Sequence, residues 1–170
     1  MADTSTATRT AEETVLGWLD AIAARQLDRI PEFWHPEGVQ DWVALGVFRG
    51  HEEIRGLFEG IFESTPDFEL TVERTVADEG HCVVQWRSRG TFEGGPFNGI
   101  EPTGRVLQLR GCDVIEVEDG RIVRNTVYYD GAEFARGVGM LPPQDSGAER
   151  AMVSAFNGFT RLRRAVAERI

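Results

Sequence analysis

Apolar positions along this chain recur first at helical spacing and then, from Phe68 onward, at strand spacing. In the first part, the helical period predicts three helices, at residues 11–25, 27–34 and 51–63. Pro36 and Gly38 interrupt the pattern before a brief predicted strand at 39–43, and Gly46 and Gly50 bound the loop after it. We therefore expect the first part of the chain to be mainly helical.

Period-two alternation predicts four long strands in the second part, at residues 68–77, 82–92, 105–117 and 122–129. The pairs Glu79-Gly80 and Asp119-Gly120 are typical of tight turns between neighbouring strands. A longer loop rich in glycine and proline, residues 93–104, joins the second strand to the third. We expect a strongly curved antiparallel meander with this loop at one mouth of the fold.

The end of the chain returns to helical spacing. Residues 131–140 predict a short helix that Pro142 and Pro143 terminate. An amphipathic helix is expected beyond them, and it must dock on its own sheet or on a partner chain; its apolar positions are Met152, Val153, Phe156, Phe159, Leu162, Val166 and Ile170. The chain thus divides into a disordered tail (residues 1–10), one domain (11–141) and a C-terminal helical extension (142–170).

Composition narrows the classes of partner. A length of 170 residues with 41% hydrophobic content suits one domain with a substantial core. The net charge of −10 provides no basic surface for nucleic acid or for an anionic membrane. No segment resembles a signal peptide or a membrane span, so we expect a cytoplasmic protein in which Cys82 and Cys112 are free thiols.

Asp113 lies on the apolar face of its predicted strand. It shares that face with Leu109, Ile115 and Val117, whereas Arg110 and its neighbours of like phase face the other way. A buried carboxyl must be paired, hydrogen-bonded or neutral with a raised pKa. Asp113 is therefore either a structural acid, paired with a neighbouring arginine or tyrosine, or a catalytic group in an apolar cavity.

The order of elements resembles the cone-shaped α+β fold of the nuclear transport factor 2-like superfamily, over residues 11–141. Val39-Gln40-Asp41-Trp42 and Cys112-Asp113-Val114-Ile115 resemble two segments of the ketosteroid isomerases of this fold. The resemblance implies that Asp41 is a general base and that Asp113 is a protonated acid donating a hydrogen bond to an oxyanion, a pairing for which that isomerase is a known example. The tyrosine of the isomerase site corresponds here to Trp18.

A second branch of the superfamily, the SnoaL-like polyketide cyclases, is also similar to parts of the chain. Residues 99–105 (Gly-Ile-Glu-Pro-Thr-Gly-Arg) look like the loop of that group, and Asp130 with the segment 139–142 resembles its ending. The resemblance makes Asp130 a third candidate catalytic acid. The spacing from Asp130 to Glu133 equally fits a helix cap, so Asp130 is either a catalytic acid or a capping residue.

Other chemistries have less support. The fold's epoxide hydrolases carry an acid where this chain has Val127, and Arg87-Ser88-Arg89 lacks the accompanying acid, so that activity is disfavoured. His51-Glu52-Glu53 lacks a second histidine four residues on, and no spacing indicates a metal site.

The sequence therefore predicts a cofactor-independent acid–base enzyme, of isomerase or polyketide-cyclase type, acting on a hydrophobic ketone or polycyclic substrate. The alternative is a non-catalytic module of the same fold that binds a small molecule or supports dimerisation. We expect a homodimer without a cofactor or metal. The candidate substrate-binding residues, which plain core packing would also explain, are Trp18, Trp42, Trp86, Leu109, Val127 and Tyr129.

Overall fold

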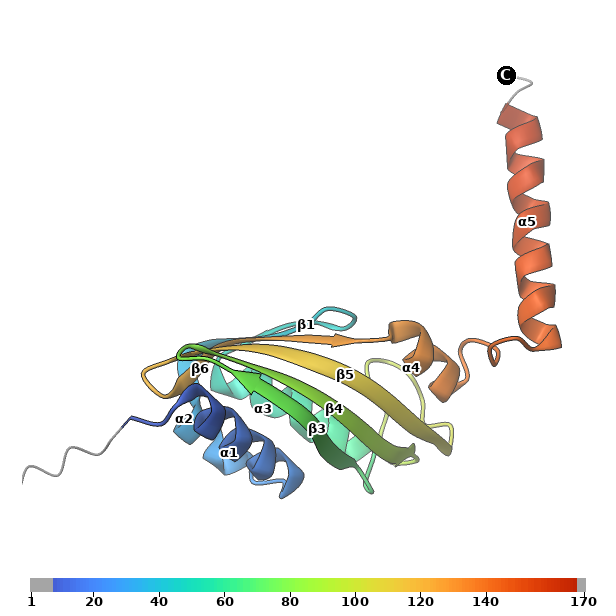
Figure 1. Cartoon of the computed structure of the whole chain (residues 1–170). Coiled ribbons are helices and arrows are strands. Elements are labelled where there is room, and N and C mark those ends of the chain that lie inside the picture. The colour runs from blue at the N-terminus through green and yellow to red at the C-terminus, as the bar shows by residue number, and fades with distance from the viewer. Residues whose placement is uncertain (1–7, 168–170) are drawn as a thin grey trace, which may run out of the picture.

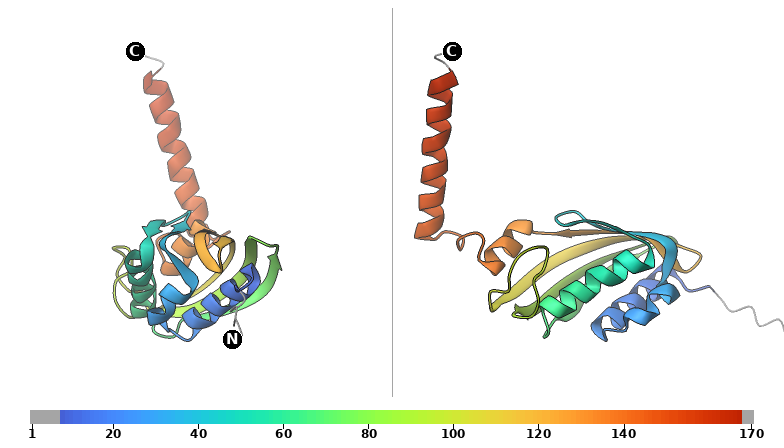
Figure 2. Two further views of the ribbon diagram at one scale, coloured as in Figure 1. Left: turned by 90° about the vertical axis from the view of Figure 1, so that its left-hand side faces the viewer. Right: turned by 180° about the vertical axis from the view of Figure 1, so that it is seen from behind.

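The computed structural model describes residues 8–167, as a curved sheet with three helices against one face (Figures 1 and 2). Most of the expected tail and the expected apolar position Ile170 lie outside these residues. Helix α1 (Ala11–Ala23) begins with a reciprocal cap, in which Thr10 Oγ1 accepts from the Glu13 amide and the Glu13 carboxylate accepts from the Thr10 amide. It ends before the expected residue 25, since Arg25 adopts a left-handed φ of 56°.

The expected second helix is split. Residues Leu27–Arg29 form a 3-10 turn (η1) and Ile30–Phe33 form α2, after which β1 (Trp34–Trp42) begins. Strand β1 is longer than predicted, although its pairing register shifts between Trp34 and Val39, around Pro36 and Gly38. Strand β2 (Gly46–Arg49) occupies the segment expected to be a loop, and α3 (Gly50–Ser64) follows it.

The four long strands agree with the prediction: β3 (Glu69–Ala77), β4 (His81–Phe92), β5 (Arg105–Glu118) and β6 (Arg121–Tyr129). The sheet order is β2-β1-β6-β5-β4-β3. These four strands form the expected antiparallel meander, and β1 adds to it in parallel beside β6, so the sheet as a whole is mixed rather than antiparallel. The physical reason is that β1 and β6 are not joined by a hairpin, and the helices and the other strands between them return the chain in the same direction.

The hydrophobic core fills the space between the inner face of the sheet and helices α1 to α3. Trp18 lies at its centre, 1% exposed, with edge-on contacts to Trp34 and Phe58. Burial of these rings stabilises the packing of α1 and α3 against the sheet.

Two helices follow the sheet. Helix α4 (Gly131–Val138) packs against β5, and Gly139 ends it with a φ of 89°. Helix α5 (Gly147–Ala167) projects from the cone and has no buried residue, so within the described residues the expected docking of this helix on its own sheet is not seen (Figure 1).

Candidate functional site

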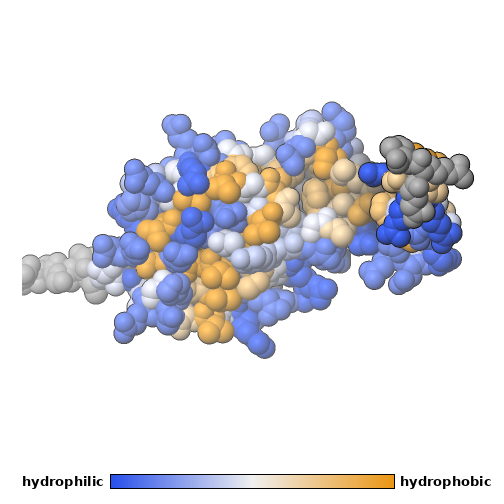
Figure 3. Space-filling model, turned by 90° about the horizontal axis from the view of Figure 1, so that it is seen from above, coloured by the Kyte–Doolittle hydropathy of each residue, from blue (hydrophilic) through white to orange (hydrophobic). Residues whose placement is uncertain are grey.

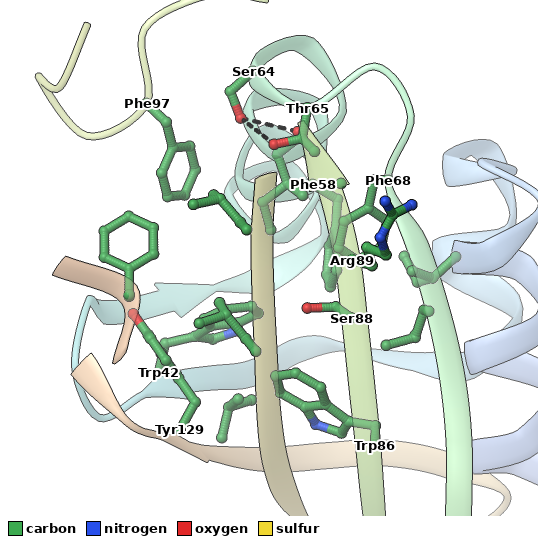
Figure 4. Close-up of a pocket in the computed structure, with 18 of the residues that line it drawn as sticks. Trp42, Phe58, Ser64, Thr65, Phe68, Trp86, Ser88, Arg89, Phe97 and Tyr129 are labelled. Carbon is green, nitrogen blue, oxygen red and sulfur yellow. Dashed lines mark hydrogen bonds between the residues drawn. The ribbon is translucent and has the colours of Figure 1, made fainter. Parts of the chain in front are cut away.

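An apolar cavity lies between the inner face of the sheet and helices α1, α3 and α4. The empty space, counted out to the open mouth, is about 1010 Å³. All six residues expected to bind a substrate line it: Trp18, Trp42, Trp86, Leu109, Val127 and Tyr129. In Figure 4, Trp42, Tyr129 and Trp86 lie towards one end of this space and Ser64 and Thr65 towards the other.

Asp113 is the only carboxylate that the described residues contribute to this cavity. It is 6% exposed on the inner face of β5, which confirms that this side chain lies on the apolar face of its strand, as expected from the sequence. Its oxygens accept two hydrogen bonds, one from Trp86 Nε1 at 2.6 Å and one from Asn125 Nδ2 at 2.8 Å. No described arginine pairs with it, so the structural salt bridge considered above is absent from residues 8–167.

The surroundings of Asp113 set its protonation. Burial raises its pKa to about 6, and the hydrogen bonds from Asn125 and Trp86 act in the opposite direction because they stabilise the charged form. With that pKa the side chain is mainly a carboxylate at pH 7. It can gain or lose a proton within a few units of neutrality, as a general acid or base must.

Gly111 makes the Trp86 hydrogen bond possible. It is the register partner of Trp86, and a Cβ built on it would lie 2.2 Å from the indole ring. The ring therefore lies across the strand at a position that only glycine leaves open. Its N–H then reaches Asp113, two residues further along β5 on the same face.

Asn125 is the site residue that the sequence analysis did not identify. It lies on β6 in phase with Val127 and Tyr129, and it is 1% exposed. The period-two alternation that places Val127 on the inner face of the sheet also places Asn125 there. Asn125 could therefore have been identified from the sequence. Its Oδ1, together with Gln40 Oε1 and Trp42 Nε1, is a buried polar atom with no partner in residues 8–167.

The structure does not bring Asp41 and Asp113 together. On β1, Gln40 and Trp42 line the cavity, whereas Asp41 lies between them on the opposite, outer face of the sheet. There its carboxylate is 3.6 Å from Arg124 Nη1. The proximity of the two acids expected from the isomerase resemblance is therefore wrong, because a one-residue step along a strand reverses the face.

Asp130 serves as a helix cap. Its Oδ1 accepts from the amides of Ala132 at 2.8 Å and Glu133 at 3.2 Å, at the start of α4. It lies outside the lining of the cavity. Of the two interpretations offered by the sequence, the geometry supports capping.

Tyr129 presents a phenol to the same cavity as Asp113. It pairs with Gly111 and is therefore a diagonal neighbour of Asp113 across the β5–β6 pair. Burial raises its pKa, so it stays protonated near neutral pH and keeps its O–H as a donor. The position expected to carry the phenol, Trp18, instead holds an indole in the core.

No group of three or more histidine, cysteine, aspartate or glutamate side chains suited to a metal ion occurs within residues 8–167. Among the helices described, none is long and apolar enough to cross a membrane. Cys82 and Cys112 are both free thiols, as expected.

The chain belongs to the SnoaL-like domain family, whose model matches residues 15–125. Its fold is the cone of the nuclear transport factor 2-like superfamily, which confirms the fold class and the resemblance inferred from the sequence. No curated protein matches the chain.

Solved structures share this fold at low identity. A proposed SnoaL-like polyketide cyclase from Jannaschia sp. CCS1 is 23% identical with a TM-score of 0.71, over 84% of this chain and 100% of that one. A SnoaL-like polyketide cyclase from Agrobacterium tumefaciens is 20% identical with a TM-score of 0.64, over 77% and 99%. An LEH-like epoxide hydrolase from M. tuberculosis is 23% identical with a TM-score of 0.60, over 75% and 84%.

Proposed function

We propose that this protein is a cofactor-independent acid–base enzyme of cyclase or isomerase type, acting on a hydrophobic ketone or polycyclic ketide. The observation that carries the proposal is Asp113, a buried carboxyl with a pKa raised to about 6, in the wall of an apolar cavity. Perturbed acids in such cavities are characteristic of catalytic groups. The cyclases among the solved relatives are consistent with this substrate class.

Asp113 acts in this proposal as the base rather than as the neutral donor that the isomerase resemblance implied. Two N–H donors already stabilise its carboxylate form, and each oxygen retains a further lone pair. The carboxylate removes a proton from the carbon next to a carbonyl, and an enolate forms. The Tyr129 phenol donates a hydrogen bond to the enolate oxygen, and Asp113 then returns the proton to the product.

The test is proton exchange next to the carbonyl. Wild-type protein in deuterium oxide, mixed with a panel of cyclic and polycyclic ketones, should exchange the α-protons of those that bind, as followed by proton NMR. Asp113→Asn should lower the rate at least about 100-fold, because general bases typically contribute that much. The rate of the wild type should rise about tenfold per pH unit below pH 6 and level off above it.

Asp41→Asn is the matched control, since it makes the same change on the outer face of the sheet. It should leave the exchange rate unchanged. Equal rates for Asp113→Asn and wild type would refute the assignment of the base. Tight binding of these ketones with no exchange by the wild type would favour a binding module and overturn the enzymatic proposal.

A further inference from the structure

Two amide side chains lie next to each other in the wall of the cavity. Gln40 of β1 and Asn125 of β6 are register partners in the parallel strand pair, and each is 1% exposed. Both line the cavity, whose other lining side chains are mainly apolar. Because paired residues of neighbouring strands lie about 5 Å apart and these two share a face, the amides form one polar patch in an apolar wall.

The polar patch contains atoms without a hydrogen-bond partner. Five buried side-chain atoms lack a partner within residues 8–167, and three of them belong to the cavity wall: Gln40 Oε1, Asn125 Oδ1 and Trp42 Nε1. Trp42 lies two residues beyond Gln40 on the same face of β1. Buried polar atoms almost always have a partner, because an unpaired one lowers stability. Their concentration in one wall therefore indicates a bound molecule that pairs with them.

Asp113 fixes the direction of the Asn125 amide. A carboxylate only accepts hydrogen bonds, so it takes the Nδ2 group of Asn125, at 2.8 Å, and the amide oxygen points away from it. The second hydrogen bond to Asp113 comes from Trp86 and not from Gln40. The amide of Gln40 can therefore be removed without removing a hydrogen bond from Asp113.

The unpaired atoms decide which chemical group of a ligand fits this wall. The oxygens of Gln40 and Asn125 need a donor, whereas the indole N–H of Trp42 needs an acceptor. A ketone oxygen only accepts, so it would leave both amide oxygens unpaired. A hydroxyl group donates one hydrogen bond and also accepts, and it can therefore pair with both kinds of atom.

We propose that Gln40 and Asn125 form a subsite for a hydroxyl group and select ketones that carry one. The hydroxyl donates to an amide oxygen of the pair and accepts from Nε1 of Trp42. This inference rests on the proposed function for the ketone, whereas recognition of the hydroxyl is a matter of binding alone. Gln40 determines specificity here and takes no part in the proton transfer.

The experiment compares ketones that differ by one hydroxyl group. α-Tetralone and its phenolic derivatives, one for each free position of the aromatic ring, are titrated into the full chain by isothermal titration calorimetry. Wild-type protein should bind at least one phenolic ketone about 10-fold or more tightly than α-tetralone. The reason is that a site built to pair with a hydroxyl rejects the analogue that lacks it.

Gln40→Met removes the amide and keeps an unbranched side chain of similar length. The ratio of the two dissociation constants should fall by at least about fivefold, which corresponds to the loss of one hydrogen bond. Without ligand, this variant should melt at or above the wild-type temperature, because it no longer buries an unpaired amide.

Gln85→Met is the matched control, since it makes the same change on the outer face of the sheet. Figure 3 looks down on this face, where charged and apolar groups are mixed. Gln85 is exposed and lies outside the lining of the cavity. The control should keep the wild-type ratio of dissociation constants.

Three results would overturn the inference. The first is equal affinity of the wild type for α-tetralone and all of its phenolic derivatives. The second is a preference for the hydroxyl that Gln40→Met leaves unchanged. The third is a lower melting temperature of Gln40→Met than of wild type, which would mean that the amide is paired within the chain.

Failure of the proposed function gives a different result. Exchange of the α-protons in deuterium oxide is followed on the same ketones. A wild type that prefers the phenolic ketones but exchanges no α-proton would refute the proposed function and support the hydroxyl subsite. Exchange without any preference for the hydroxyl would support the proposed function and refute the subsite.

Discussion

Asp113 and Asp41 lie on opposite faces of one sheet, and their surroundings give the two carboxyls different properties. Asp113 faces an apolar cavity, is 6% exposed and has a pKa raised to about 6. The Asp41 side chain is 30% exposed beside Arg124, on the outer face of the sheet. The comparison shows that, for two aspartates on this sheet, the face decides which carboxyl is buried in the apolar cavity and which lies beside an arginine at the surface.

The largest effect expected from this comparison is a pH dependence of stability. The Asp113 pKa is about 6 in the folded protein and near the ordinary aspartate value of 3.8 when unfolded, so the folded state binds the proton more tightly. Its contribution is fully present below about pH 4 and is lost as the pH rises through 6. The loss amounts to about 3 kcal/mol.

Denaturant unfolding of wild type and Asp113→Asn at a series of pH values measures this contribution. The free energy of unfolding of the variant is subtracted from that of the wild type at each pH. The contributions of exposed acids with lowered pKa values, such as Asp67 and Asp78, cancel because both proteins contain them. A difference between the two proteins that stays constant from pH 4 to 8 would mean that Asp113 is not a buried acid.

A smaller effect is expected from the indole that contacts Asp113. Trp86→Phe removes an N–H donor from a buried carboxylate, which should lower the free energy of unfolding by about 2 kcal/mol beyond the packing loss. The same change should raise the pKa of Asp113 further, as measured by carboxyl NMR.

Trp42→Phe is the comparison for that variant, since Trp42 lines the same cavity but its Nε1 has no partner in residues 8–167. The two tryptophans lose similar ring volume. If both variants lose the same stability, the hydrogen bond to Asp113 contributes little.

The smallest effect should come from the outer face. Asp41→Asn breaks a partly exposed ion pair with Arg124, and such pairs contribute less than about 1 kcal/mol. Thermal unfolding measures the difference in stability between Asp41→Asn and wild type. This difference should stay below about 1 kcal/mol at both low and high salt. A loss comparable to that of Trp86→Phe would show that Asp41 has a structural role that its contacts do not reveal.

Much of the cavity wall was predictable from the sequence. The period of two along β5 and β6 is fixed by the geometry of an extended chain, so Asp113, Leu109, Val127 and Tyr129 were all assigned to the inner face correctly. The same rule applied to β1 places Asp41 on the other face of the sheet from its neighbour Trp42. The resemblance to the isomerases led to the wrong expectation for Asp41. A match between two short sequence segments does not fix which face of the sheet a side chain occupies.

The sequence by itself determined the elements and which side chains share a face, because these depend on local backbone geometry and on the spacing of apolar residues. Only the tertiary structure decided that β1 runs parallel to β6, that Gly111 leaves room for Trp86, and that Trp86 and Asn125 both reach Asp113. The two hydrogen bonds to Asp113 come from residues 27 and 12 positions away along the chain. Strand pairing and burial bring them together, and no local pattern specifies which strands become neighbours.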